Sequence, residues 1–477
     1  MDILALINTF AEGLSQISMF FYEHPDMLAY VEQQAADLSH KTTADFLAGL
    51  LTEMDETIAK SNTRKDRYKI QRKKSRTLIS TVGDVTFTHT QYYDTEEKRY
   101  RCLLDELIKL PDHERFTVLA ESKALYEAEV HSYQHAADSL HIGNQTVSKV
   151  AVMNKVHAIT EELPEPECDE KKKCKYLYIE ADEDHIHKQH QGEIKGCMIG
   201  KLIYVYEGKA DLCEGKRTLI SPHYHGGLYK GSDQNRLLWE EVQKYIESHY
   251  DHKTLKQVYI SGDGGAWIKA GVDYVDKSVF VLDRFHLMKY INRASRLTLD
   301  DQDSVKGKFY KYIYKNKPKK LNKLLDKIYK VTGNADVVED VRIYINSNWE
   351  GIQLAFHDKH VLGCSAEGHV SNVYSERMSS RPMGWSECGS DRMCRLRCYV
   401  RNYGADKIVD LVEYKRSMAM NLLRATGTDD LIPVHEKHRR ISQWQRSAAA
   451  YVNRMQATIP GNTVKKALAI REQLGNL

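Results

Sequence analysis

The spacing of apolar residues changes along the chain, and each spacing predicts a different kind of element. Residues 1–60 repeat apolar side chains every three or four positions, which predicts helices. Residues 77–93 alternate around Gly83 and Asp84, which predicts two short strands joined as a β-hairpin. Helical spacing returns from residue 114. The first third of the chain is therefore expected to be mostly helical, with one hairpin.

The pattern changes after residues 161–175, a charged segment with two prolines that indicates a linker. Beyond it, short apolar runs predict strands at 176–182, 196–206, 216–225, 256–263 and 278–286, with a helix at 233–250. Elements in this order predict a mixed sheet covered by helices. Residues 287–360 and the remainder, including the basic 435–440, have helical spacing. We expect an α/β core that carries a helical insertion.

These patterns divide the chain into successive segments. The expected boundaries are 1–60 for an N-terminal helical region, 61–160 for a basic region that contains the β-hairpin, 161–175 for the linker, 176–290 for the first part of the core, 291–360 for the helical insertion, 361–404 for a further helix and an Arg-rich segment, and 405–477 for a C-terminal helical region.

The composition is that of an ordinary globular protein. Of the 477 residues, 42% are hydrophobic and 28% are charged, which is enough for sizeable cores. There is no run of about 18 apolar residues, so we expect no membrane-spanning segment. The N-terminus contains acids and no basic leader, which argues against a signal peptide. We therefore expect a cytoplasmic protein with no membrane partner.

The cysteine pattern gives no sign of a disulfide framework. The chain has nine cysteines, and an odd number without a secretion signal argues for reduced thiols. Spacings such as Cys168 to Cys174 and Cys388 to Cys394 differ from the C-x2-C pairs of structural zinc sites. Buried or incidental thiols are expected.

The net charge is only +3, but the basic residues are concentrated. Residues 60–76 hold nine Lys and Arg against one Asp, and residues 306–330 hold ten Lys against one Asp. Such runs occur on proteins that bind nucleic acids, and also on solvated helix faces. In the first run, Arg72, Lys73 and Lys74 are the expected phosphate contacts.

Residues 132–156 predict a helix-turn-helix, whose second helix would enter the DNA major groove. Ser132 can cap a helix that extends through Leu140, and residues 141–144 supply a tight turn. A second helix is expected to begin near Gln145, with an inward face at Val147, Val150 and Ala151. The expected DNA contacts are Gln145, Ser148 and Lys149. An ordinary pair of packed helices is the alternative.

Three acidic residues are expected at strand ends or at the start of a helix, where a carboxylate can bind a ligand. Asp182 is expected to end one apolar strand and Asp263 another, where the glycines that follow Asp263 allow a sharp turn. Ligands of α/β sheets bind at the carboxyl ends of strands. Glu367 follows Ser365, a suitable N-cap, and should lie in the first helical turn, where the helix dipole favours a negative charge. Spacing alone does not distinguish these acids from solvated turn residues.

Three carboxylates brought together repel one another unless a cation neutralises them. Mg²⁺ suits this role because it prefers oxygen ligands and leaves room for substrate phosphates. Two such ions about 3.5–4 Å apart are the usual clamp for in-line phosphoryl transfer on nucleic acids. We expect Asp182, Asp263 and Glu367 to be both the metal ligands and the catalytic residues, with Mn²⁺ as a substitute metal.

The chain resembles the ISLre-type transposases in the stretches YLYIEADEDHIHKQ, VYISGDGGAWI, VFVLDRFHLMKY, CSAEGHV and SSRPMGWSECGSDRMCRLRCYVRNYG. This bacterial insertion-sequence family is related to the Mutator-like DDE transposases, and the resemblance extends over nearly the whole chain. It implies a ribonuclease H-like core with a DDE triad and transposition at terminal inverted repeats. By position, the triad is Asp182, Asp263 and Glu367.

Other acids and one histidine lie near the triad. The wider relatives have a Cys and a His three residues apart after the last core strand, whereas this chain has Asp283 and His286 there. That difference argues against a metal or thiol site at this motif, and His286 either orders the edge of the active site or is purely structural. Glu180 and Asp184 share a strand face with Asp182. Asp184 is therefore either a supporting acid or the first ligand itself.

Basic and aromatic residues follow the third carboxylate. Arg377 and Arg381 are candidate phosphate contacts because guanidinium matches phosphate geometry. A solvated helix face is the alternative, as it is for Arg392, Arg395, Arg397 and Arg401. Trp385 either stacks on an unpaired base or belongs to the core.

Glu376 is the rival third carboxylate. At about 100° per residue, it and Glu367 should point in opposite directions, so only one of them can face the metals. Glu367 is preferred because it belongs to the SAEGHV stretch and is flanked by small residues.

The expected function is Mg²⁺-dependent cleavage of double-stranded DNA and strand transfer, acting on the terminal inverted repeats of the element and on target DNA. A ribonuclease H-like nuclease or Holliday-junction resolvase is an alternative that would share the carboxylates. A DNA-binding regulator without catalysis is another. We expect a homo-oligomer, because two element ends must be brought together.

Overall fold

The computed structural model describes residues 3–421 except 141–142, 167, 169, 191–192, 214–215 and 382, together with 438–439, 441–443, 445–446 and 449. The chain divides into two compact units. Unit 1 comprises Met1–Ala128, Ser132–Val152 and Val409–Leu477, and unit 2 comprises Glu129–His131 and Met153–Ile408. Most of the predicted C-terminal helical region, including most of the basic 435–440 segment, lies outside the described residues.

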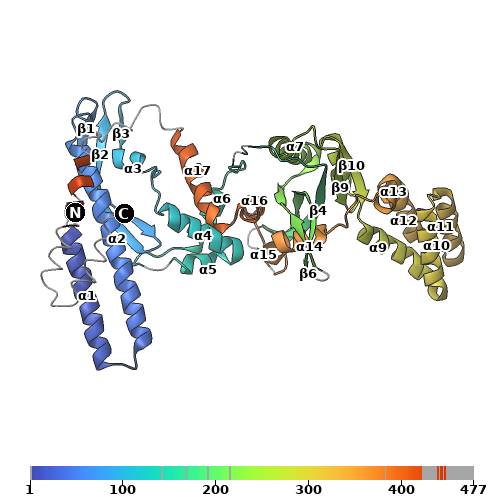
Figure 1. The fold of residues 1–477 in the computed structure, drawn as a ribbon, viewed down its shortest axis with the longest axis horizontal. Helices are drawn as coiled ribbons and strands as arrows, with labels where there is room; N and C mark the ends of the chain where they lie inside the picture. The colour runs from blue at the N-terminus through green and yellow to red at the C-terminus, as the bar shows by residue number, and fades with distance from the viewer. Residues whose placement is uncertain are drawn as a thin grey trace. The chain divides into compact units, whose positions relative to one another are not determined.

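Unit 1 begins with two long helices, α1 (Ile3–Glu23) and α2 (Leu28–Lys60), which Figure 1 shows side by side. They confirm the helices predicted for residues 1–60. Gly13 of α1 lies against the side chain of Leu38, so the two helices approach closely at this point.

Helix α1 is relevant to the expectation that no segment spans a membrane. It is long and apolar enough to cross one by length and composition. Its apolar residues do not form an unbroken run, because isolated polar residues interrupt them. Core helices of soluble proteins and signal sequences meet the same test, so α1 is weak evidence for a membrane span.

The sheet of unit 1 has three antiparallel strands, β1 (Tyr68–Ser80), β2 (Gly83–Asp94) and β3 (Arg99–Arg101). Ser80 pairs with Gly83 across the predicted turn, where Gly83 has a φ of 110°. The hairpin is confirmed, but β1 is longer than predicted and includes much of the basic run. Helix α2 covers one face of this sheet, where Asp55 accepts hydrogen bonds from the amide and hydroxyl of Thr90 at 2.8 and 2.6 Å.

Five shorter helices follow the sheet or complete the unit. They are α3 (Leu103–Leu107), α4 (Val118–Val130), α5 (Tyr133–Asp138), α6 (Lys149–His157), which continues into unit 2, and α17 (Ile408–Asn421). Helix α17 returns to unit 1 near the end of the described chain. There Arg416 donates to the buried carboxylate of Glu121 at 2.7 Å and to the carbonyl of Phe116 at 2.9 Å.

Unit 2 contains a mixed five-stranded sheet with the order β10-β9-β4-β5-β8. Its strands are β4 (Tyr176–His190), β5 (Glu193–Tyr206), β8 (His223–Leu228), β9 (Gln257–Gly262) and β10 (Ser278–Leu282). Strands β4, β9 and β10 are parallel, and β5 is antiparallel to both of its neighbours. The predicted mixed α/β sheet is confirmed.

A small hairpin, β6 (Gly208–Cys213) and β7 (Lys216–Ile220), lies outside this sheet in the strand pairing. The single strand predicted at 216–225 is therefore wrong. The break comes at Ser221, whose φ of 49° lies outside the strand region.

Helices cover both faces of the five-stranded sheet (Figure 1). On one face, α7 (Gly231–His249) and α8 (Ala266–Lys269) pack on odd-numbered β4 residues such as Leu177 and Ile179, and the short helix η1 (Ala270–Asp273) follows. The other face carries α14 (Ala366–Val370), the π-helical segment η3 (Ser371–Ser375), α15 (Glu376–Met378) and α16 (Glu387–Tyr403), before η4 (Ala405–Lys407). Tyr374 packs so closely on Gly226 that no Cβ would fit there.

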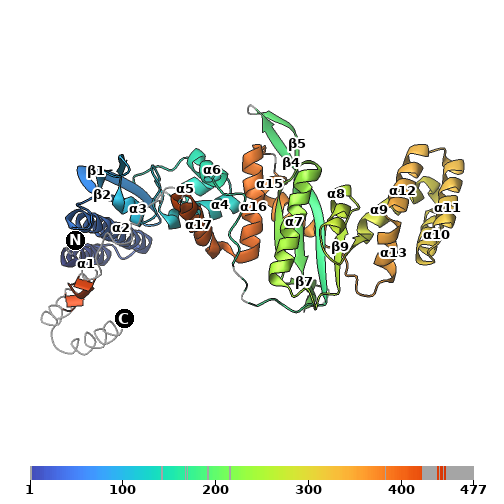
Figure 2. The ribbon, with the colours of Figure 1, turned by 90° about the horizontal axis from the view of Figure 1, so that it is seen from above.

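The helical insertion comes between β10 and α14 in the sequence, and Figure 2 shows its helices α9 to α13 grouped together. It comprises α9 (Arg284–Ser295), η2 (Arg296–Asp301), α10 (Gln302–Tyr314), α11 (Pro318–Thr332), α12 (Ala335–Ser347) and α13 (Trp349–His357). These helices bury their own apolar core, which includes Phe309, Leu325 and Val341. The lysines at 319, 320 and 323 of α11 are exposed on the outside of this core.

Candidate functional site

Asp182 lies inside strand β4, not at its end. The strand continues to His190 because β5 pairs with it antiparallel over this length, with Asp182 opposite Leu202. The prediction that Asp182 terminates the strand is therefore wrong. The parallel pairing of β4 with β9, however, stops at the pair of Glu180 and Ser261, so Asp182 lies just beyond the carboxyl end of the parallel part.

Asp263 directly follows β9, at the neighbouring carboxyl end of the same parallel pair. Gly264 has a φ of 93° and turns the chain sharply, as predicted. The Asp263 carboxylate accepts a hydrogen bond from the Gly265 amide at 2.8 Å, and the Tyr344 hydroxyl donates to the Asp263 carbonyl at 2.7 Å. These bonds hold the turn, and adjacent parallel strands bring both aspartates to the same edge of the sheet.

The negative charge of Asp263 acts on the carboxyl group of Asp182. Burial raises the pKa of Asp182 to about 6, and the negative charges of Asp263 and Glu183 add to this effect. The amide of Glu183 and the nearby His286 act in the opposite direction. A carboxyl group that resists ionisation beside a second carboxylate is in the environment that a bound cation would neutralise.

Asp283 and His286 follow strand β10, which lies beside β9 in the sheet. Asp283 caps α9 by accepting from the Phe285 amide at 3.1 Å, and its own amide donates to the Gly262 carbonyl at 2.9 Å. Its second carboxylate oxygen lies 3.0 Å from Nδ1 of His286. That contact raises the pKa of His286, and Asp263 and Asp182 add to it. The structure thus places His286 beside both aspartates, as the ordering role would require.

Glu367 lies in the first turn of α14 and is exposed. Ser365 occupies the N-cap position, but its hydroxyl does not cap the helix, and it contacts Glu180 Oε2 at 3.1 Å instead. Among the described residues, the ligand atoms of Asp182, Asp263 and Glu367 do not form a group within 4.8 Å of one another. The two aspartates lie near each other, whereas no contact in this part of the structure joins Glu367 to them.

Glu180 is the residue whose importance the sequence did not reveal. Its carboxylate is almost fully buried and accepts from the hydroxyls of Tyr204 and Tyr206, the latter at 2.6 Å. It also accepts from the Ser365 amide at 2.6 Å and pairs with Lys209 at 3.2 Å. This network fixes the first residue of the α14 turn to β4, two residues before Asp182. A lone Glu within the apolar run YLYIEA was the available signal.

Asp184 contacts the other end of the same helical segment. Its carboxylate accepts from the Ser379 hydroxyl at 2.8 and 3.1 Å, just after α15. Glu180 and Asp184 therefore tie the two ends of the α14–α15 segment to β4, on either side of Asp182. This contact is consistent with the supporting role considered for Asp184.

The π-helical segment η3 changes the geometry expected for Glu367 and Glu376. A π turn contains about one residue more than an α-helical turn. The nine positions from Glu367 to Glu376 therefore rotate the side chain about the helix axis by as much as about eight α-helical positions, or roughly 800°. The two side chains then differ by about 80°, and the expectation that they point in opposite directions is wrong. Both are exposed, and the Glu376 carboxylate lies 4.0 Å from the Arg397 guanidinium.

The arginines after Glu367 are mostly structural. Arg377 is buried with its guanidinium 4.9 Å from the Trp385 ring, so the predicted phosphate contact does not fit its position. Arg397 pairs with Glu129 at 2.8 Å, and Arg395 pairs with Asp391 at 3.1 Å. Arg381 is exposed, as a DNA contact requires.

Trp385 belongs to the core. It is buried, and its indole N–H donates to the Met378 carbonyl at 3.1 Å. The core alternative is therefore the one that the structure shows, and base stacking by this residue is not supported.

The predicted basic contacts of unit 1 lie on β1. Arg72 and Lys73 are exposed, and Lys74 is partly exposed. Arg72 donates to the Gln91 side chain at 2.9 Å across the hairpin. Because alternate residues of a strand face opposite sides, Arg72 and Lys74 share one face and Lys73 lies on the other.

The predicted helix-turn-helix is only partly reproduced. Ser132 caps α5, but the helix ends at Asp138 and not at Leu140. The second helix, α6, begins at Lys149, with Ser148 as its cap, because Gln145 is held in the preceding loop by Arg115 and Asp84. Residues 141–142 of the predicted turn lie outside the described residues.

The inward face of α6 also differs from the prediction. Val152 and Val156 are buried, while Val150 is half exposed and Val147 is buried in the loop. The predicted face was wrong because the helix begins four residues later than expected. Lys149 is exposed at the start of the helix, where DNA contact is geometrically open.

A second group of metal-type ligands in unit 2 lies away from the aspartates. Glu165, His223 and His225 bring their ligand atoms within 4.8 Å of one another. Burial lowers the pKa of His223 to about 2 and that of His225 to about 3, so both imidazoles are neutral. Stacking of His223 on Tyr245 at 3.9 Å makes this pair part of the packed interior.

Comparison with known proteins identifies the family. A family model described as "Uncharacterised protein family (UPF0236)" matches residues 27–415. UPF0236 proteins of Caldanaerobacter subterraneus subsp. tengcongensis are 32% identical over 371 residues, covering 77% of this chain and 76–77% of two of those relatives. The name of one such relative carries eleven locus numbers, and that of another carries four. The chain belongs to the UPF0236 family.

Proposed function

We propose that this protein is a DDE transposase that cleaves double-stranded DNA and joins the released ends to target DNA. The observation that carries the proposal is that Asp182 and Asp263 both lie just beyond the carboxyl end of the parallel pairing between β4 and β9, where burial raises the pKa of Asp182 to about 6. The mixed sheet with a single antiparallel strand is compatible with a ribonuclease H-like core.

The residues present fit a divalent metal such as Mg²⁺. Asp182 and Asp263 offer hard oxygen ligands, and the raised pKa of Asp182 reflects burial and uncompensated negative charge, which a cation relieves. Asp182, Asp263 and Glu367 would hold the ions, with Mn²⁺ able to replace Mg²⁺. Two bound ions supply activation of an attacking water or 3′-hydroxyl and stabilisation of the leaving oxygen.

The chain's own groups prepare this edge of the sheet. Gly264 makes the sharp turn after β9, and the Asp263 carboxylate accepts a hydrogen bond from the Gly265 amide, which holds it at the end of the strand. The Asp283–His286 pair orders the start of α9 beside the aspartates, and the Asp283 carboxylate raises the pKa of His286. Glu180 and Asp184 position the helical segment that carries Glu367.

The family supports the same proposal from a different direction. A protein that occurs at eleven loci in one genome is distributed as a mobile element would be. The partners we propose are therefore the terminal inverted repeats of such an element and target DNA, with a homo-oligomer holding two ends. We place this activity in the bacterial cytoplasm.

The test incubates the full chain with Mg²⁺ and a labelled duplex that carries the element's end. Joined products support the transposase, nicks without joining indicate a nuclease or resolvase, and a band shift without cleavage indicates a DNA-binding regulator. Asp182→Asn and Asp263→Asn should each abolish cleavage, because each removes a metal-binding charge while keeping the side-chain shape. The matched control is Asp211→Asn, an exposed acid of the β6–β7 hairpin, which should cleave like the wild type.

A further inference from the structure

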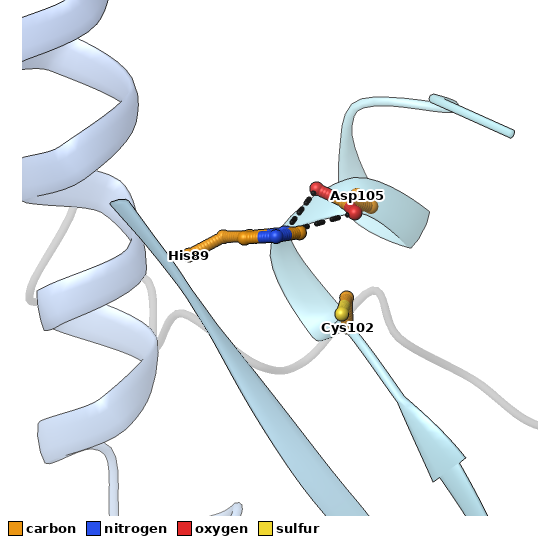
Figure 3. A group of neighbouring side chains, drawn as sticks. All are labelled: His89, Cys102 and Asp105. Carbon is orange, nitrogen blue, oxygen red and sulfur yellow. Dashed lines mark hydrogen bonds and ion pairs between the residues drawn. The ribbon is translucent and has the colours of Figure 1, made fainter. Parts of the chain in front are cut away.

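Unit 1 contains a cluster of three different ligand types that the proposed function does not use. His89 on β2, Cys102 at the N-cap of α3 and Asp105 in the first turn of α3 bring one ligand atom each within 4.8 Å of one another. Figure 3 shows the imidazole of His89 pointing at the carboxylate of Asp105, with the sulfur of Cys102 beside them. We propose that His89, Cys102 and Asp105 bind a Zn²⁺ ion.

The local structure explains why these side chains converge. Cys102 and Asp105 are three residues apart at the start of a helix, so their side chains lie on the same side of its first turn. This is the relative position of the two ligands in a C-x2-C pair, with a carboxylate in place of the second thiolate. A search of the sequence for paired cysteines therefore misses it.

The spacing of the ligand atoms suits a tetrahedral metal. Nδ1 of His89 lies 3.0 Å from both oxygens of Asp105. Two ligands at about 2.0–2.1 Å from a tetrahedral Zn²⁺ are about 3.3 Å apart, so a shift of a few tenths of an ångström opens the site. His89 and Asp105 are both buried, which keeps their side chains in place.

Arg76 holds the carboxylate from behind. Its guanidinium donates to Asp105 at 2.5 Å and to the carbonyls of Pro111 and Glu114 at 2.9 and 2.7 Å. Groups that hydrogen-bond to a ligating carboxylate fix its orientation at metal sites. Arg76 is thus expected to position Asp105, and it leaves the second carboxylate oxygen directed at His89.

The ligand set selects the metal. Imidazole, thiolate and carboxylate together suit Zn²⁺, whereas Mg²⁺ prefers sites made of oxygen atoms alone. The cluster lines a cavity of about 720 Å³, from which water can supply the fourth ligand. Such an ion would join β2 to the start of α3 and stiffen the sheet that carries Arg72 and Lys74.

The test uses the full chain, stripped of metal and then titrated with Zn²⁺ or Co²⁺. We expect about one Zn²⁺ per chain at the cluster and a thiolate-to-cobalt charge-transfer band with Co²⁺. Cys102→Ser should lose the band, and His89→Gln and Asp105→Asn should weaken binding at least about tenfold, within the range seen when a metal site loses supporting groups. Cys102→His should still bind the metal but lose the band, which separates ligand loss from misfolding.

Two variants serve as matched controls. Cys213→Ser removes an exposed thiol of unit 2, and His113→Gln removes an exposed imidazole from the same cavity without touching the cluster. Both should keep the cobalt band. A folded wild-type chain without the band, or a band that persists in Cys102→Ser, would overturn the proposal and leave His89, Cys102 and Asp105 as a hydrogen-bonded group. The result is independent of DNA cleavage, because Asp182→Asn should also keep the band.

Discussion

The carboxylate of Glu180 accepts a hydrogen bond from the backbone amide of Ser365 at 2.6 Å, across 185 residues of sequence. This one bond connects the strand that carries Asp182 to the helical turn that carries Glu367. The acids proposed to hold the metals are therefore positioned by a fourth acid that is itself buried and has no access to solvent.

Glu180→Gln should weaken both stability and cleavage. The change leaves Lys209 and two tyrosine hydroxyls facing a neutral amide, and breaking a buried charged network costs about 3–5 kcal/mol. We expect this loss in urea unfolding of the full chain, and at least a tenfold fall in cleavage as α14 loses its anchor. Glu240→Gln on the exposed face of α7 should stay within about 0.5 kcal/mol of the wild type. Equal losses in both variants would show that the network has no special role.

Asp182→Asn should stabilise the metal-free protein while abolishing cleavage. The pKa of this carboxyl is raised from 3.8 to about 6 in the fold, so the unfolded chain ionises first and stability falls as pH rises from about 4 to 6. Above about pH 6, ionisation of Asp182 lowers the free energy of unfolding by a constant amount of about 1–3 kcal/mol. Asparagine cannot ionise, so the variant should gain stability at pH 7 and little at pH 4.

Chemical unfolding at the two pH values measures this difference. Adding Mg²⁺ should stabilise the wild type and leave the variant unchanged, because the variant lacks a ligand. Asp184→Asn is the comparison, since it weakens the Ser379 contact and should show no gain at pH 7. A variant that is less stable than the wild type at pH 7 would contradict the prediction.

Neutralising Arg72, Lys73 and Lys74 to Gln should flatten the salt dependence of DNA binding. Each phosphate contact contributes roughly −0.9 to the log–log slope, so three lost contacts change it by about 2–3. Fluorescence anisotropy with the full chain measures the slope. The matched triple is Lys319, Lys320 and Lys323, exposed on α11, which should keep the wild-type slope. If the α11 triple flattens it instead, the 306–330 run is the DNA-binding surface.

Glu367→Gln should abolish cleavage, and Glu376→Gln should keep it within a few-fold. Glu367 lies two residues after Ser365, which is hydrogen-bonded to Glu180, whereas Glu376 lies 4.0 Å from Arg397, with its side chain 71% exposed. The assay is the same labelled duplex, with DNA binding as the control for folding. Loss of cleavage in Glu376→Gln alone would assign the third carboxylate to the second half of the helical segment.

The sequence predicted the strands of unit 2 well because buried strands are short apolar runs. It could not show that β4 continues past Asp182, since residues 183–190 are polar apart from Ile186 and are held in the strand by pairing with β5. It indicated Asp263 correctly because two glycines mark a turn at a strand end.

What the sequence missed depends on contacts between distant segments. The only local signal for Glu180 is its position within an apolar run, and its partners at 204, 206, 209 and 365 are far along the chain. The arginines of α16 looked like a surface that binds phosphate, but Arg395 and Arg397 are buried in ion pairs. The π turn at 371–375 inserts a residue that no helical periodicity predicted, and it changes the relative direction of Glu367 and Glu376.

The return of α17 to unit 1 has a consequence for how the protein is made. Glu121 is fully buried and is paired with Lys415 and Arg416, which the ribosome synthesises almost 300 residues later. The ion pairs of Glu121 with Lys415 and Arg416 in unit 1 therefore cannot form until all of unit 2 has been synthesised. A prematurely terminated chain lacks Lys415 and Arg416, so the buried carboxylate of Glu121 loses these two cations.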